Sequence, residues 1–211
     1  MKSYTLIPNE AGKIFKPEDL YTITCMYLTA KDDYTTNSTR EQLAQIAGLS
    51  FAYIKDKFLP RLRKSKFCEI EGYTELSDSQ IRKRNKYILP QPITNYRIIS
   101  KEMLEDTNLT PTEKGIIIGL YSLTVNNSFN IGFNKSQISK YLNISRNSYL
   151  KYEKSLIEKG YIELLSNDTT NDRHGDFSEG IVLNCSWLGT KELNRKVYES
   201  THNNANFQEL G

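Results

Sequence analysis

The side chains best suited to recognising a ligand lie in the second half of the chain, where Arg146 and Asn147 directly follow Ser145. Arg can bind O6 and N7 of guanine through two hydrogen bonds, and Asn can bind N6 and N7 of adenine in the same way. Each such pair discriminates against a wrong base by about 1–3 kcal/mol. At the start of a helix in the major groove, such residues would read sequence. The candidate base-reading residues are Arg146, Asn147, Ser148, Lys151 and, in the first half, Tyr53.

A second group of residues carries positive charge and could bind DNA phosphates. Residues 50–66 hold six Lys and Arg against one Asp, and a further basic cluster occupies residues 82–84. Contacts to phosphates give affinity without sequence information, and they weaken steeply with salt. A solvated basic face is the alternative, and Asp56 would repel a phosphate. The candidate phosphate and wing residues are Lys55, Lys57, Arg61, Arg63, Lys64, Arg82, Lys83, Arg84, Lys86, Lys135, Lys154 and Arg173.

Other kinds of chemistry lack the residues that they need. The chain has no GxxxxGK, HExxH or GxSxG motif, and its two histidines, His174 and His202, are well separated. Its 14 tyrosines fall mostly on apolar helical positions, which indicates core packing rather than nucleophilic catalysis. Cys25, Cys68 and Cys185 show neither disulfide nor zinc spacing. We therefore expect no enzymatic activity, no cofactor and no metal.

The candidate reading residues require two helices joined by a short turn. Asn134 and Gln137 have the spacing of a capping box, and apolar residues follow at i, i+3 and i+4. Asn143 tolerates the left-handed conformation at the end of a helix, and Ser145 suits the N-cap of the next one. A strand-like segment comes after the second helix. This order predicts a helix-turn-helix followed by a β-wing.

The same pattern occurs earlier in the chain. Residues 39–50 match residues 134–145 at an offset of 95, and the strands that follow match at an offset of 94. Each half is predicted to contain a strand, a helix, a helix-turn-helix, a strand, a long loop and a returning strand. We therefore expect an α+β fold of two tandem winged helix-turn-helix modules, related by an internal repeat of about 94 residues.

Prolines mark the boundary between the halves, because Pro90 and Pro92 interrupt regular structure. We predict an N-terminal winged helix at residues 1–92 and a C-terminal winged helix at residues 93–190. A short helix and a flexible tail are expected at residues 191–211. Pro60 lies inside the long helix of the first module and should kink or split it.

The second half resembles the helix-turn-helix domains of phage replisome-organiser and plasmid replication proteins. The resemblance lies in the opening Leu109-Thr-Pro-Thr-Glu-Lys-Gly115 and in the ending Leu156-Ile-Glu-Lys-Gly-Tyr-Ile162. The first half departs from that ending, because it has Ser65-Lys66-Phe67 where the second half has Lys-Gly-Tyr. The tandem layout is similar to plasmid replication initiators with two winged helices in one chain. The resemblance implies sequence-specific binding of double-stranded DNA in replication initiation. The ending also recurs in bacterial transcription regulators, so transcription control stays open.

Composition limits the partners. The net charge is +3, and residues 1–95 hold 15 Lys and Arg against 11 Asp and Glu. No apolar run approaches the roughly 18 residues of a membrane span, and the N-terminus has no apolar stretch, so we expect a cytoplasmic protein without a membrane partner. The expected partner is double-stranded DNA, with a homodimer or replication proteins as further candidates. The competing hypothesis is a tandem winged-helix scaffold that binds protein, and a DNA-processing enzyme is the third alternative.

Overall fold

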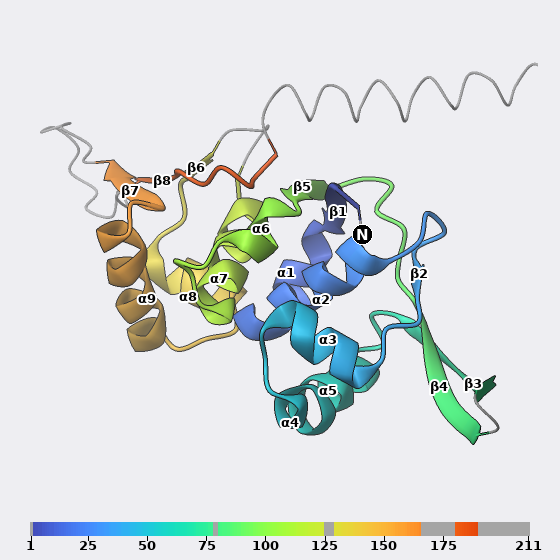
Figure 1. Ribbon diagram of the computed structural model, residues 1–211. Helices are drawn as coiled ribbons and strands as arrows, with labels where there is room; N and C mark the ends of the chain where they lie inside the picture. The colour runs from blue at the N-terminus through green and yellow to red at the C-terminus, as the bar shows by residue number, and fades with distance from the viewer. Residues whose placement is uncertain (1, 78–79, 125–128, 166–179, 190–211) are drawn as a thin grey trace, which may run out of the picture.

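The computed structural model describes residues 2–77, 80–124, 129–165 and 180–189, and all structural statements below refer to these residues. The fold is α+β, as predicted: helices alternate with short antiparallel sheets (Figure 1). The predicted helix and tail at 191–211, and the whole of the predicted loop before the last strand, lie outside the described residues.

The first half begins with a strand and two helices and ends with a long hairpin. Its elements are β1 (Tyr4–Pro8), α1 (Asn9–Ile14), α2 (Pro17–Thr29), β2 (Thr35–Thr36), α3 (Arg40–Ala47), α4 (Phe51–Tyr53), the π-helical segment η1 (Ile54–Phe58), α5 (Leu59–Ser65), β3 (Glu69–Ser77) and β4 (Gln80–Ile88).

The second half repeats this order with one continuous helix in place of α4, η1 and α5. Its elements are β5 (Tyr96–Ser100), α6 (Glu102–Glu105), α7 (Pro111–Ser122), β6 (Asn130–Ile131), α8 (Lys135–Tyr141), α9 (Arg146–Glu158), β7 (Ile162–Leu165) and β8 (Gly180–Leu183). The sheet of the first half has the strand order β2-β4-β3, and that of the second half has the order β6-β8-β7. Both are antiparallel, so the two halves share element order and sheet topology.

Local sequence signals explain where the helices begin. Thr39 and Asn134 are the N-caps of α3 and α8, and each forms a complete capping box with the Gln three residues later. Ser50 and Ser145 cap the helices that follow, each accepting a hydrogen bond from the backbone N–H three residues on. These four caps lie where the sequence predicts them.

The turns also match between the halves. Gly48 and Asn143 are left-handed at the ends of α3 and α8, with φ of 60° and 54°. Lys66 and Gly160 are left-handed at the ends of the next helices, with φ of 53° and 78°. Lys66 therefore adopts, at some cost in backbone strain, the conformation for which the second half uses glycine.

Pro60 has the predicted effect of splitting the long helix. It lacks the N–H that would bond to the carbonyl of the preceding turn, and α5 begins with it in its first turn. The π-helical segment η1 precedes this point. Ile54, Phe58 and Leu62 nevertheless stay fully buried, as the apolar spacing predicts.

The two halves share one hydrophobic core rather than two separate ones. β1 pairs with β5 in an antiparallel sheet, so the first strand of each half contacts the other. α2 packs against α7, and the buried residues of both helices belong to one apolar cluster. The contact is close because Gly115 of α7 has no side chain: a Cβ there would lie 1.8 Å from the backbone oxygen of Pro17. The relative placement of the halves is therefore fixed by packing.

Replacement of Gly115 by Ala should destabilise the whole fold, because the new methyl group would collide with the backbone of α2. Overpacking of this kind costs about 1–3 kcal/mol, and we expect the upper end because the obstacle is backbone. The free energy of unfolding in urea measures the loss. Gly72→Ala is the matched control, since nothing lies within 4 Å of a Cβ at Gly72. Equal stability of the two variants would contradict the shared core.

Candidate nucleic-acid interface

The first turn of α9 presents the main candidate reading residues to solvent. Ser145 caps the helix, accepting a hydrogen bond from the backbone N–H of Ser148 at 3.1 Å. Arg146, Asn147 and Lys151 are exposed. The side chain of Ser148 is half-buried and its hydroxyl lies 2.8 Å from that of Ser145, so it supports the cap. The structure thus brings together Arg146, Asn147 and Lys151 as accessible groups.

The turn before α9 is held by the first half of the chain. The side-chain amide of Asn143 donates to the backbone oxygen of Lys13 at 2.9 Å. Tyr141 donates from its hydroxyl to the backbone oxygen of Asn9 at 3.1 Å. Both acceptors belong to α1, so α1 fixes the corner between α8 and α9 from across the interface between the halves.

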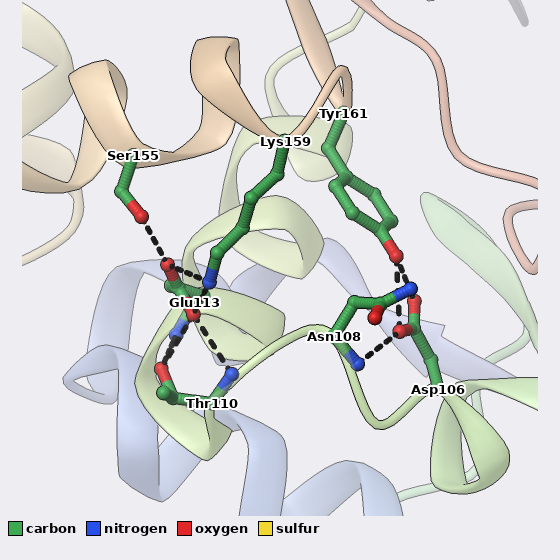
Figure 2. A network of polar contacts seen from close by, with 7 residues as sticks. All are labelled: Asp106, Asn108, Thr110, Glu113, Ser155, Lys159 and Tyr161. Atoms are coloured by element: carbon green, nitrogen blue, oxygen red, sulfur yellow. Dashed lines mark hydrogen bonds and ion pairs between the residues drawn. The ribbon is translucent and has the colours of Figure 1, made fainter.

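A buried carboxylate anchors the other end of α9 (Figure 2). Glu113, in the first turn of α7, accepts hydrogen bonds from Lys159 Nζ at 2.8 Å to both oxygens and from Ser155 Oγ at 2.7 Å. It also completes a capping box with Thr110. Burial alone would raise the pKa of Glu113, but the hydrogen bonds from Lys159, Thr110 and Ser155 outweigh it and lower the pKa to about 2.

A second carboxylate fixes the chain just after α9. Tyr161, directly before β7, lies with its hydroxyl 2.9 and 2.8 Å from the two oxygens of Asp106. Trp187 donates from Nε1 to the same carboxylate at 3.1 Å. Figure 2 shows Tyr161 and Lys159 reaching from the end of α9 towards the segment that leads into α7. α9 is thus tied down at its C-terminal end, while its N-terminal turn is exposed.

The first half has an equivalent anchor. Asp19 lies 94 residues before Glu113, and Arg61 lies 94 residues before Ser155. Arg61 forms an ion pair with Asp19, with Nε to Oδ2 at 2.7 Å and Nη2 to Oδ1 at 2.7 Å. Tyr53 donates from its hydroxyl to Asp19 at 2.8 Å. The carboxylate of Asp19 is 2% exposed.

This geometry gives a structural role to two residues that were predicted to contact DNA. Tyr53 was predicted to read bases and Arg61 to bind phosphate, but the polar groups of both contact the buried carboxylate of Asp19. The cost of burying that carboxylate unpaired favours these contacts over contacts to DNA. We therefore assign Tyr53 and Arg61 to the anchor of the first half.

The hairpin β3–β4 divides the basic cluster at residues 82–84 between two faces. Side chains alternate along a strand, so Arg82, Arg84 and Lys86 lie on one face of β4 and Lys83 on the other. The first face is opposite acidic residues: Arg84 pairs with Glu75 at 3.0 Å, and Lys86 pairs with Glu71 at 3.6 Å. The predicted cluster therefore does not form one continuous phosphate-binding surface, because Glu71 and Glu75 form ion pairs with basic side chains on one face of the hairpin.

Between α3, α5 and the hairpin β3–β4 lies a polar recess of about 290 Å³. Arg63, Lys83 and Arg84 line it, so residues predicted separately for the helix and the wing meet here. Arg40, at the start of α3, joins them and was missed by the sequence analysis, while Glu41 is the acidic residue of the lining. Basic side chains around an open polar recess suit a phosphate group.

The remaining candidates have varied surroundings. Lys55 and Lys57 in η1 and Lys64 in α5 are exposed. Lys55 lies 3.8 Å from Asp56, and an exposed ion pair of this kind contributes little to stability. The three remaining phosphate candidates belong to the second half of the chain. Lys135 pairs with the buried Glu153 at 2.9 Å, Lys154 lies 3.9 Å from Glu158, and Arg173 is outside the described residues.

The anchoring residues Asp19 and Glu113 are the part of the site that sequence reasoning missed. The signal was present, because the internal offset of 94 aligns both acids in the first turns of α2 and α7. Comparisons of the chain with protein-family models, curated proteins and solved structures found no match. Among the described residues, no helix is long and apolar enough to cross a membrane, and no group of acidic, His and Cys side chains is placed to hold a metal ion.

Replacement of Glu113 by Gln should lower the free energy of unfolding at pH 7 by about 2 kcal/mol, because charged hydrogen bonds to Lys159 and Ser155 are lost. The folded pKa lies below the ordinary 4.5, so the carboxylate stabilises the fold fully above about pH 4.5 and loses this effect as pH falls towards 2. The stability gap between wild type and variant should close over this window.

The exposed Glu102, in the first turn of α6, provides the control substitution Glu102→Gln. Urea unfolding of all three proteins between pH 2 and 7 makes the comparison. A gap for Glu113→Gln that is constant with pH would show that its carboxylate does not act through charge.

Proposed function

We propose that this protein binds double-stranded DNA sequence-specifically through two tandem winged helices, in replication initiation of a plasmid or phage or in transcription control. The observation that carries the proposal is the exposed first turn of α9, with Arg146 and Asn147 accessible on a helix whose other end is anchored. The repeated order of helix, strand, helix, helix, strand and strand supports a winged-helix reading of each half.

The second half is the proposed base reader. The N-terminal end of a helix carries a partial positive charge, which favours its approach to the DNA backbone. Arg146 and Asn147 at this end have the donor and acceptor patterns that recognise guanine and adenine edges in the major groove. Lys151 lies one turn further along the same helix and is also exposed.

The first half is the proposed backbone clamp. Its helix presents Phe51 and Ala52 where the second half has Arg146 and Asn147, so it offers few groups for base edges. The recess lined by Arg40, Arg63, Lys83 and Arg84 is suited to a phosphate. In this proposal the first half supplies affinity and salt dependence, and the second half supplies most of the sequence preference.

The alternative is a scaffold that binds another protein, and one observation favours it. Leu76 and Ile81 are paired across the hairpin β3–β4 and are 75% and 76% exposed. Exposed apolar side chains of this kind often mark protein contacts. The scaffold would need neither Asn147 nor the basic recess, so DNA binding distinguishes the two functions.

Binding of the full chain to a randomised pool of duplex DNA at two salt concentrations tests the proposal. We expect retention of a defined sequence motif, with affinity that falls steeply as salt rises because several phosphates are neutralised. No retention even at low salt would favour the protein-binding scaffold.

The double variant Arg63→Ala, Lys83→Ala should weaken binding to all sequences alike. Removing two phosphate contacts should reduce the slope of log affinity against log salt by roughly 2. Lys101→Ala is the control, because Lys101 is exposed beside Glu105 and far in sequence from the recess. An unchanged salt slope in the double variant would remove the recess from the DNA interface.

Replacement of Asn147 by Ala should relax the preference at one base position, at a cost of about 1–3 kcal/mol for the preferred sequence. The salt slope should stay unchanged, since no phosphate contact is lost. Sequencing of the DNA recovered with wild type and with the variant makes the comparison. An identical motif for both proteins would exclude Asn147 as a reader.

A further inference from the structure

Phe51 is a large apolar side chain that lies outside the core. It is 42% exposed at the start of the continuous helical segment formed by α4, η1 and α5, and its neighbour Ala52 is also exposed. Ile54, one turn further along, is fully buried, so the segment enters the core only after Phe51. An aromatic ring left in water gains free energy when an apolar group covers it.

The internal repeat aligns these two residues with the candidate base readers of the second half. Phe51 lies 95 residues before Arg146, and Ala52 lies 95 residues before Asn147. In both halves the pair follows a serine N-cap whose hydroxyl accepts a hydrogen bond from the backbone N–H three residues on, at 3.1 Å. The two first turns therefore share their capping geometry but present different chemistry, which is polar in α9 and apolar in α4.

The anchor of the first half keeps the first turn of α4 apolar. Tyr53, the third residue of this turn, donates from its hydroxyl to the buried carboxylate of Asp19 at 2.8 Å, and Arg61 binds the same carboxylate. The side chains of Phe51 and Ala52 contain no hydrogen-bonding group. The turn therefore offers a ligand an apolar surface whose position is fixed by the anchor.

The charge around Phe51 indicates what kind of ligand would cover it. Residues 50–66 carry six Lys and Arg against one Asp, and Lys55, Lys57 and Lys64 are exposed. A second copy of the chain, approaching through the same surface, would be repelled by this positive charge, whereas a polyanion is attracted. In the major groove of DNA, the apolar group at the base edge is the C5-methyl group of thymine, which Phe and Ala side chains can contact.

We infer that the first half reads thymine through its C5-methyl group, with the ring of Phe51 covering the methyl group and the small side chain of Ala52 leaving room for the base edge. This inference rests on the proposed function and deepens it. The two halves then read DNA by different chemistry: Arg146 and Asn147 form hydrogen bonds to guanine and adenine, and Phe51 makes an apolar contact with thymine. Phe51 is accordingly a specificity-determining residue of the first half.

The test replaces thymidine by deoxyuridine in the duplex, which removes the C5-methyl group and keeps the base-pairing hydrogen bonds. The thymidines of the motif recovered from the randomised pool are replaced one at a time, and competition binding gives the affinity of the full chain for each duplex. The protein is unaltered in this scan, so a folding defect cannot produce the result. The scan is repeated with Phe51→Ala and with the control Ile93→Ala, which removes a 78% exposed apolar side chain between β4 and β5.

For wild type and Ile93→Ala we expect one or more thymidines at which deoxyuridine lowers the affinity about fourfold, the value for loss of one buried methyl group. Phe51→Ala should bind the unmodified duplex more weakly and should be insensitive to deoxyuridine at those positions. Tolerance of deoxyuridine at every position by wild type, or a loss that persists in Phe51→Ala, would overturn the inference while leaving DNA binding intact. Absence of any bound duplex would overturn the proposed function as well.

Discussion

In each half of the chain, a buried carboxylate in the first turn of a helix holds the helix proposed to contact DNA. Asp19 binds Arg61 and Tyr53, and Glu113 binds Lys159 and Ser155. A buried charge without partners costs several kcal/mol, so these contacts restrict where the partner helix can lie. The exposure and direction of the first turn of α9 depend on this constraint, because its far end is fixed.

The shared core extends that constraint to the whole molecule. Each carboxylate fixes the position of a helix within its own half. The packing of α2 on α7 fixes the position of one half relative to the other. α1 adds a direct contact to the turn before α9 through Asn143. The consequence is that the two halves form one packed unit, in which the candidate basic and base-reading residues are distributed unequally between the halves.

Local sequence patterns predicted much of this fold. Capping residues, apolar spacing and the internal offset gave the helices, the turns at Gly48 and Asn143, and the split at Pro60, because these depend on neighbours along the chain. Contacts between residues distant in sequence could not be predicted from these local patterns. The role of Arg61 depends on Asp19, 42 residues away, and the division of the basic cluster on β4 depends on its register with β3. The pairing of β1 with β5 left no local signal at all.

The most direct test of the account is a structure of the full chain bound to a duplex that carries its recovered motif. We expect the first turn of α9 in the major groove, with Arg146 and Asn147 on base edges, and the recess around Arg63 and Lys83 against a phosphate. The ion pairs of Asp19 and Glu113 should be unchanged. A complex in which the first turn of α9 faces away from the DNA would contradict the account.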